Sequence, residues 1–470
     1  MDNWYTYTQG DILIEPYNFL KILELKVVKG INQHGKFYIK GIISDEFSDE
    51  YVENAGSYQI IKASLKDDKE NITKIFHGIV THIAIDSFNN IRTLEIEAQS
   101  ETFLMDLEKK SRSFQGDYVT YSEIFNNINK SYGDAKMVDY VTNSETIDNI
   151  IVQYNETDWE FLKRLASHFN TGLIPECTLG GVKYFIGDDG PGTVYELDEF
   201  NYSINKGLKE YKLKSSNSSY ELNDINFLSY EVVTNRIFNS LTSVSFKGRK
   251  LSIYKSEFTL VKGMLSNKYI LRDSNGVKVK KMFNENIVGT SLEGYILDVK
   301  NDIVKVSLKI DGYSNSKDTT VWLPYSTVFS SPDGTGWYCM PEVNDAIRLY
   351  FPDNVESNAY AISSVNLQSS NSSKRSDPSV KSIGTKYGKE IIMRPGAIDI
   401  ISSNNSMRLS DSGGIQVNSN NQISMSGSSV NISGGYVSIQ GSGGVTLSQS
   451  GASITIKDNI TMKGMKINTQ

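Results

Sequence analysis

The chain has 470 residues, 39% of them hydrophobic and 22% charged, so it is long enough for three or four folded domains. Its formal net charge is −7, and the segment from residue 389 carries six basic and four acidic residues, which leaves −9 on the rest and excludes a basic nucleic-acid surface. No apolar run approaches the roughly eighteen residues of a membrane-spanning helix, and the two cysteines are too far apart to suggest a disulfide framework.

Residues 1–110 are predicted to form a β meander that begins without the basic start and apolar core of a signal peptide. We therefore expect the chain to be made in the cytoplasm. Alternating apolar residues predict strands at 22–28, 37–43, 58–65, 72–86 and 91–98, with the first turn running through residues 32–35. The acidic segment 45–50 lacks the spacing and the glycine of a calcium loop, and we interpret it as a solvated loop.

Residues 111–215 combine helices with short strands. The clearest helix begins after Thr157, because Glu160 stands three residues later and completes a capping box. Its apolar stripe consists of Trp159, Leu162, Leu165, Ala166 and Phe169. Helical spacing favours packing of this stripe in a core over a ligand-binding shelf. We further expect Glu160 to pair with Arg164 at i, i+4 and Gly172 to end the helix.

Two β-rich regions follow. The first, 216–290, has strand signals near 226–233, 240–246, 250–261 and 268–272. The second, 291–366, has strand signals at 292–300, 303–310, 319–325, 346–351 and 360–365. Five strands with a Gly/Pro turn fit a small Greek-key barrel of the OB type. This region has five basic and ten acidic residues, which favours a structural adaptor over a single-stranded nucleic-acid binder. The Ser- and Asn-rich segment 367–388 is predicted to be a linker.

The segment 389–470 contains eleven pairs of apolar residues at i and i+2, most of them 7 to 9 residues apart and separated by Gly or Asn turns. Each pair predicts a short strand with one dry face. Two inward side chains in eight residues make one wall, which cannot enclose a core, so we expect three identical chains wound into a prism. The predicted trimer core is Ile398, Ile400, Met407, Leu409, Ile415, Val417, Ile423, Met425, Val430, Ile432, Val437, Ile439, Val445, Leu447, Ile454 and Ile456.

Five stretches resemble one family of proteins. SRSFQG (111–116), YSEIFNNINKSYG (121–133) and VQYNETDWEFLKRLASHFNTGL (152–173) resemble the hub of VgrG-family spikes and of the phage T4 tail hub. GWYCMPEVNDAIRLYFPDNVESNAYAISSVN (336–366) resembles the end of their OB domain, and the repeat from residue 389 resembles their triple-stranded β-helix. The shared order of hub, OB barrel and prism covers nearly the whole chain.

The resemblance implies a mainly β multidomain fold. It implies hub β-barrels at 1–110 and 216–290, an α+β insert at 111–215, an OB-fold barrel at 291–366 and a trimeric β-helix spike at 389–470. In such a homotrimer the barrels form a pseudo-hexameric ring on a contractile tube, in contact with tube and baseplate proteins. The particle is a virion or a secretion apparatus, and contraction drives the prism through the target cell envelope. We expect no catalytic residue, no cofactor and no metal ligand.

Two features depart from related phage needles. Those of the T4 type carry a lysozyme domain between barrel and prism, but the 22 residues of the segment 367–388 are too few for an enzyme. Iron-tipped spikes end in histidines, whereas the histidines of this chain all precede the expected OB barrel. They are His34, His77, His82 and His168. We interpret His77 and His82 as structural.

The sequence stops at residues 466–470, directly after its last apolar pair. This predicts a flat trimeric end that a PAAR-like tip protein or an effector covers, with Met465 and Ile467 as the contact residues. An enzyme lacks support because no nucleophile elbow, zinc-type cluster or phosphate-binding loop is recognisable. The alternative function is a trimeric tail fibre or adhesin that binds a cell-surface receptor. The type of contractile system stays open among phage, bacteriocin, type VI secretion and extracellular injection systems.

Overall fold

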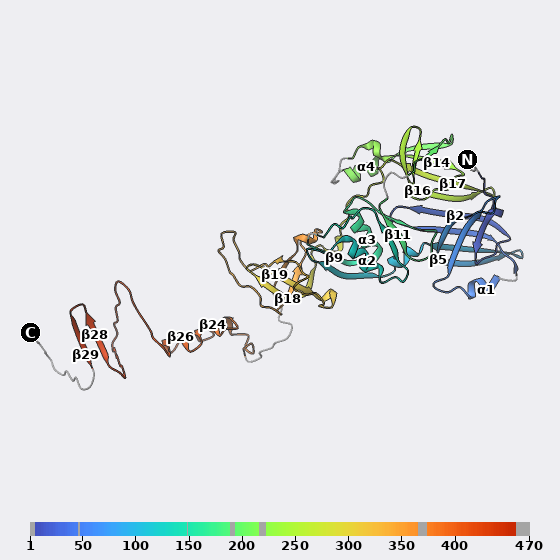
Figure 1. Ribbon diagram of the computed structural model, residues 1–470. Coiled ribbons are helices and arrows are strands. Elements are labelled where there is room, and N and C mark those ends of the chain that lie inside the picture. The colour runs from blue at the N-terminus through green and yellow to red at the C-terminus, as the bar shows by residue number, and fades with distance from the viewer. Residues whose placement is uncertain are drawn as a thin grey trace, which may run out of the picture. The chain divides into compact units, whose positions relative to one another are not determined.

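The computed structural model describes residues 5–45, 48–147, 149–188, 193–215, 222–364 and 374–456. It divides into two compact units, Met1–Leu367 and Gln368–Gln470 (Figure 1). Both units are built mainly from β-strands arranged in several sheets, as the sequence predicted.

The first unit contains a 12-stranded sheet. In pairing order its main path is β1 (Ile12–Glu15), β4 (Ile60–Lys66), β5 (Ile72–Phe88), β6 (Ile91–Gln99), β3 (Gln33–Ile42), β2 (Lys21–Gly30), β16 (Arg249–Val261), β17 (Met264–Arg272), β14 (Leu228–Thr234) and β13 (Tyr202–Lys206). Off this path, β15 (Ser243–Phe246) pairs with β16, and β12 (Tyr195–Leu197) pairs with β15. The strands predicted in the first 110 residues are confirmed, with ends shifted by a few residues.

Strand β2 pairs antiparallel with β16, which joins the two regions predicted as separate hub barrels (Figure 1). Lys26 lies opposite Thr259, and Gly30 lies opposite Lys255. The two regions also share one apolar core, in which Phe37 from the first region belongs to the same cluster as Tyr269 from the second. The two predicted regions are therefore parts of one sheet with a continuous interior.

The turn between β2 and β3 is shorter than the predicted turn at 32–35. Only Ile31 and Asn32 lie between the strands, and Asn32 adopts a positive φ of 61°. Gly35 is instead a residue of strand β3. A Cβ atom at this position would lie 2.5 Å from the Cys177 sulfur, so the close approach requires glycine. This glycine permits close packing rather than a turn.

The α+β part connects the two halves of the large sheet. Its strands are β7 (Lys109–Gln115), β8 (Lys136–Asp139), β9 (Ile150–Thr157), β10 (Leu173–Pro175) and β11 (Lys183–Ile186). The α-helices of the unit are α1 (Ser48–Glu53), α2 (Tyr121–Asn129), α3 (Asp158–Ser167) and α4 (Leu208–Ser215). Short 3-10 helices are η1 (Gln9–Asp11), η3 (Glu101–Asp106), η4 (Asp224–Phe227), η5 (Glu285–Ile287), η6 (Lys309–Asp311) and η7 (Glu356–Asn358).

Helix α3 begins where the sequence predicted. The Thr157 hydroxyl accepts a hydrogen bond from the Glu160 amide at 3.1 Å, and the Glu160 carboxylate accepts one from the Thr157 amide at 2.9 Å. The predicted core stripe is buried from Trp159 to Ala166. The helix ends at Ser167 rather than at Gly172, so that prediction is wrong.

Five strands follow in the region predicted to be an OB barrel. They pair in the order β20 (Leu323–Pro324), β19 (Ile303–Leu308), β18 (Ser291–Lys300), β21 (Ala346–Tyr350) and β22 (Tyr360–Ile362). A parallel bridge between Tyr325 and Ala361 joins the two outer strands of this order. Strand β20 is much shorter than the predicted 319–325, and Pro324 within it offers no amide donor to a ladder.

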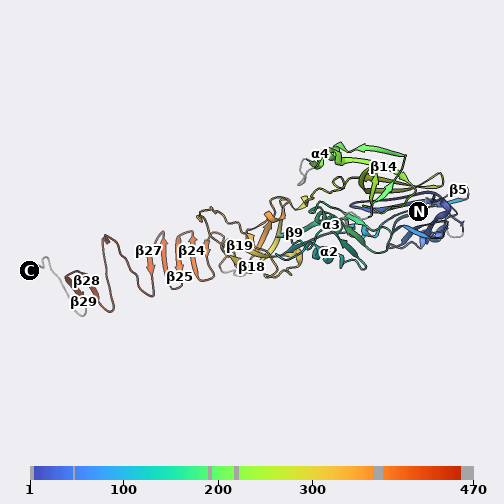
Figure 2. The same ribbon diagram turned by 45° about the horizontal axis from the view of Figure 1, so that its top comes forward.

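The second unit contains an antiparallel meander and a separate hairpin (Figure 2). The meander consists of β23 (Lys381–Gly384), β24 (Lys389–Arg394), β25 (Ala397–Ser402), β26 (Asn405–Ser410) and β27 (Gly414–Asn418). The hairpin consists of β28 (Val445–Gln449) and β29 (Ala452–Ile456). The described residues 419–444 form no strand, so the strands predicted for the three apolar pairs between Ile423 and Ile439 are absent from the single chain. Two-residue apolar pairs without a ladder partner lack the hydrogen bonds that define a strand.

Candidate functional site: an exposed apolar sheet face and a buried ion network

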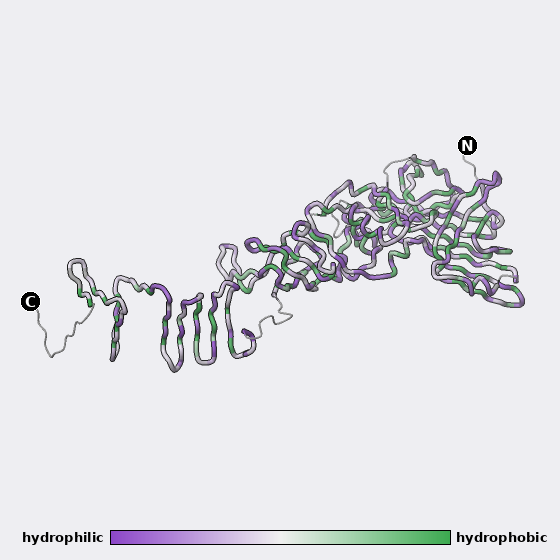
Figure 3. Tube along the Cα trace, turned by 60° about the horizontal axis from the view of Figure 1, so that its bottom comes forward, coloured by the Kyte–Doolittle hydropathy of each residue, from purple (hydrophilic) through white to green (hydrophobic). Residues whose placement is uncertain are grey.

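The meander places its apolar pairs on one face of the sheet. Ile400 lies opposite Ile391 on one side and Met407 on the other, and Leu409 lies between Ile398 and Ile415 in the same way. Residues that face each other in an antiparallel sheet project to the same side, so these pairs form a continuous apolar surface. The alternation of hydrophobic and hydrophilic residues along these strands is visible in Figure 3.

This face is exposed in the single chain. Ile415 is 68% exposed, Val417 is 53% exposed and Ile398 is 41% exposed. Full burial of one such side chain is worth about 1.5–3 kcal/mol relative to exposure. Contiguous apolar patches of this kind mark surfaces that pair with another molecule.

The opposite face of the same strands carries charged residues together with some apolar ones, and its charged groups are partly paired within the chain. Asp399 accepts a hydrogen bond from the Arg394 side chain at 3.0 Å, and the Arg408 guanidinium lies 3.7 Å from its other oxygen. Asp399 is 8% exposed, as is Ile392 beside it in the ladder. Within the part of the chain that the structure describes, the apolar face is thus the side of the sheet that lacks a partner.

The remaining predicted trimer-core residues divide into two groups. Val445 and Leu447 on β28 lie opposite Ile456 and Ile454 on β29. The six core residues between β27 and β28 are exposed and outside any strand: Ile423, Met425, Val430, Ile432, Val437 and Ile439. Met465 and Ile467, predicted to contact a tip protein, lie outside the described residues, as does the end at 466–470.

One residue of the apolar face was missed by the sequence analysis. Ile383 on β23 lies opposite Ile391 and is 48% exposed, so it extends the face into the segment predicted to be a linker. A single apolar residue gives no i, i+2 repeat, which is why the periodicity did not reveal it.

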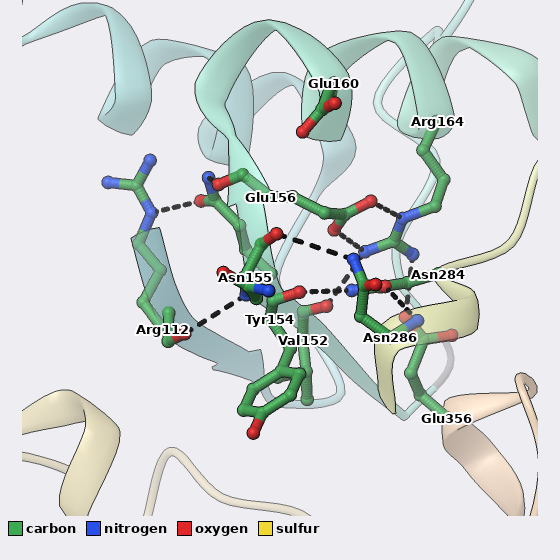
Figure 4. Close-up of polar contacts among 12 residues, drawn as sticks. Arg112, Val152, Tyr154, Asn155, Glu156, Glu160, Arg164, Asn284, Asn286 and Glu356 are labelled. Carbon is green, nitrogen blue, oxygen red and sulfur yellow. Dashed lines mark hydrogen bonds and ion pairs between the residues drawn. The ribbon is translucent and has the colours of Figure 1, made fainter. Parts of the chain in front are cut away.

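A second notable cluster is the ion network around Arg164 (Figure 4). The Arg164 guanidinium donates two hydrogen bonds to Glu156, at 2.9 and 2.8 Å, and one to Glu356 at 2.7 Å. It also donates to the carbonyl oxygen of Val152 at 2.8 Å. Arg164 is 2% exposed, and burial raises the pKa of the Glu156 carboxyl although Arg164 opposes the shift.

The predicted pair of Glu160 with Arg164 is wrong. Glu160 instead caps its own helix through the Thr157 amide, and Figure 4 shows its carboxylate away from the guanidinium. The partner Glu356 lies on η7, 192 residues further along the chain. The network therefore ties α3 and β9 to the five-stranded sheet region, which no local sequence signal indicates.

Strand β9 reinforces this junction through its side chains. Ile150 and Val152 pack in the core of the five-stranded sheet, whereas Ile151 packs in the core of the α+β part. Side chains alternate between the two faces of a strand, so β9 contributes one face to each core.

Asp158 forms a further buried cluster at the start of α3. Its carboxylate accepts hydrogen bonds from Lys110 at 2.8 Å, from Tyr132 at 2.7 Å and from Gln153 at 3.0 Å, and it also pairs with Arg112. Burial raises the pKa of Asp158, but these donors outweigh burial and hold it below its usual value. The carboxylate is thus kept ionised as a structural anchor.

His34, His77, His168 and Cys177 are partly or fully buried, whereas His82 and Cys339 are exposed. His34 lies 3.2 Å from Asp106, and His77 lies 3.1 Å from Glu101. Burial lowers the pKa of His168 to about 3. Within the described ranges, no group of three or more His, Cys, Asp or Glu side chains could hold a metal ion. Cys177 and Cys339 are both free thiols.

Several solved structures have folds similar to that of this chain. An E. coli protein, c3393, is described as a component of the type VI secretion system with structural similarity to the T4 tail proteins gp27 and gp5. It aligns over 74% of this chain and 98% of its own, with a TM-score of 0.51 and 10% identity. The half-lidded PdpA–VgrG complex of Francisella aligns over 88% of both chains, with a TM-score of 0.57 and 13% identity. A lidless PdpA–VgrG complex aligns over 88% of this chain and 98% of its own, with a TM-score of 0.58 and 13% identity.

The chain has a VgrG-like fold. At 10–13% identity this similarity concerns the fold alone. A family model described as the Alg8 N-terminal domain matches residues 46–182, less than a third of the chain. No curated protein matches the sequence. Within the described part of this VgrG-like chain, no helix is long and apolar enough to cross a membrane.

Proposed function

We propose that the protein is the homotrimeric hub and membrane-puncturing spike at the tip of a contractile tail or secretion tube. The observation that carries this proposal is the exposed apolar face of β23–β27, whose side chains stand in register across five strands. Three copies of such a wall, with their apolar faces turned inward, bury side chains that one chain leaves in water. The VgrG-like fold supports this reading of the whole chain.

We assign the parts of the chain accordingly. The regions 1–110 and 216–290 form the two hub barrels, which share one sheet through β2 and β16. The region 111–215 is the insert between them. The region 291–366 is the OB barrel, a proposal supported by its five strands and by the bridge that joins the outer two. The region 389–470 is the trimeric β-helix.

The proposed partners follow from these parts. The hub binds tube and baseplate proteins and caps the tube, and the C-terminal end carries a PAAR-like tip protein or an effector. The particle is assembled in the cytoplasm, and contraction expels the spike toward the target envelope. The proposed role is mechanical rather than catalytic. The stiffness that it needs arises from close packing of the apolar side chains along the prism.

The native mass of the full-length protein tests the proposal. We expect three copies for the unmodified chain. The double substitution Ile415→Asp and Val417→Asp places charges on the apolar face of β27 and is expected to weaken the trimer. Gln416→Asp, on the opposite face of the same strand, is the matched control and keeps three copies. A monomeric unmodified protein, or a control that dissociates equally, contradicts the proposed spike.

A further inference from the structure

Residues 326–343, within the connection between β20 and β21, form an ordered arm. The Trp337 amide donates to the carbonyl oxygen of Phe329 at 2.8 Å, and the Ser331 amide donates to that of Thr335 at 2.9 Å. At the base of the arm, the Tyr338 hydroxyl donates to the carbonyl oxygen of Asn301 at 2.8 Å. These hydrogen bonds give the arm a hairpin-like structure and attach it to the rest of the five-stranded region.

The arm is unusually apolar for an exposed segment. Val328 is 87% exposed, Phe329 58%, Trp337 50% and Tyr338 74%. Aromatic residues at this density, with few charges among them, are typical of the centre of a protein interface. The arm contains no basic residue, and its acidic residues are Asp333 and Glu342.

We propose that the arm packs against a second copy of this chain, so that the arms contribute an interface to the trimer. This inference rests on the proposed trimeric spike. The absence of lysine and arginine argues against anionic partners such as lipid headgroups or nucleic acid, which need basic residues for attraction. An aromatic surface with two acidic residues and no basic residue fits an apolar partner surface better than an anionic one.

The length of the chain supports a second copy as the occupant. Ten residue steps separate residue 364 from residue 374, and an extended chain of that length spans at most about 33–36 Å. If three chains are wound together from residue 374 onward, the linker keeps residue 364 of each chain within this distance of its own residue 374. Tethering of this kind raises the effective concentration of one arm near its neighbours.

The two cysteines supply a direct measurement. Cys339 lies on the arm and is exposed in the single chain, whereas Cys177 is buried, and burial raises its pKa to about 11. A thiol reagent such as Ellman's reagent therefore reports on Cys339 in the folded protein. We expect the full-length trimer to protect Cys339. The double substitution Val328→Ser and Phe329→Ser is expected to increase its reaction rate by at least about tenfold, as loss of 1.4 kcal/mol of local protection predicts.

The matched control is Phe88→Ser with Ile91→Ser, two exposed residues that face each other at the turn between β5 and β6. This control leaves Cys339 protected. A native mass of three copies with a freely reacting Cys339 overturns the proposed arm contact while the trimer stands. Protection that appears only after another component of the particle is added also overturns it. A monomeric native mass overturns the proposed spike instead.

Discussion

Arg164 shows how a single buried residue can join parts that are distant in sequence. Its guanidinium satisfies two carboxylates and one carbonyl oxygen, and one of those carboxylates belongs to η7. Replacement of such an ion group by apolar residues can be neutral, but removal of one partner leaves the others buried and unpaired. The main effect of Arg164 on stability is therefore to neutralise the two buried carboxylates, and the complete ion network adds little net free energy.

Arg164→Met is predicted to lower the free energy of unfolding by about 3–5 kcal/mol, because Glu156 and Glu356 lose the buried cation that pairs with both of them. Urea denaturation of the full chain measures the change. Glu160→Gln is the control, since glutamine also completes a capping box, and we expect a change within about 0.5 kcal/mol. We expect the triple variant, Arg164→Met with Glu156→Gln and Glu356→Gln, to regain most of the lost free energy of unfolding. Equal effects of Arg164→Met and Glu160→Gln would contradict this account.

At the scale of secondary-structure elements, glycines decide where elements can approach each other. A Cβ atom at Gly172 would lie 2.5 Å from the Ile31 side chain and 2.8 Å from that of Asn32, both in the β2–β3 turn. The side chain of Asn32 also accepts a hydrogen bond from the Leu173 amide at 2.8 Å. Gly172 is therefore required by the contact between β10 and the turn, not by the end of α3.

Gly172→Ala is predicted to destabilise the first unit by about 1–3 kcal/mol, because the added methyl group overpacks the contact with the turn. The midpoint of thermal or urea unfolding measures the effect. Gly133→Ala is the matched control, since no atom lies within 4 Å of its Cβ position. If both substitutions have the same small effect, the close approach does not constrain the fold.

The elements of this fold divide into those that a sequence can predict and those that it cannot. The start of α3 was predicted because Thr157 and Glu160 act within one turn, and most strands of the large sheet were predicted because alternation is a local signal. The short strands β1, β12 and β13 were not predicted. The partner of Arg164 and the role of Gly172 depend on residues far away in the chain. The apolar residues of β24–β27 were predicted to share a face, and the ladder places them so. The strands predicted between Ile423 and Ile439 are absent from the single chain, because an apolar repeat does not by itself supply a hydrogen-bonding partner.

At the scale of the whole molecule, the C-terminal unit differs from the first in how its apolar residues are covered. Among its described residues, the first unit buries many of its apolar side chains in three cores. The C-terminal unit leaves most of its apolar pairs exposed. Folding of this unit is therefore expected to be coupled to assembly, since only association removes these side chains from water.

Replacement of Val437, Ile439, Val445 and Leu447 by serine is predicted to lower the Tm of the C-terminal transition of the full-length trimer sharply. These four side chains belong to adjacent pairs of the proposed prism core, and their burial on assembly would be lost. Differential scanning calorimetry measures the transition. Ser438→Thr with Thr446→Ser, between the members of the same pairs, is the control. An unchanged Tm in the fourfold variant would show that these pairs do not hold the prism together.

Among the described residues, each strand of the meander β23–β27 pairs only with its neighbours in sequence. A hairpin could therefore be removed or duplicated without changing the register of the strands on either side, because the described strands of the meander form no pairs with strands distant in sequence. An odd number of added strands would reverse the direction of the chain, whereas an even number would preserve it. The length of this unit is thus a modular quantity, adjustable in steps of two strands during evolution or in the laboratory.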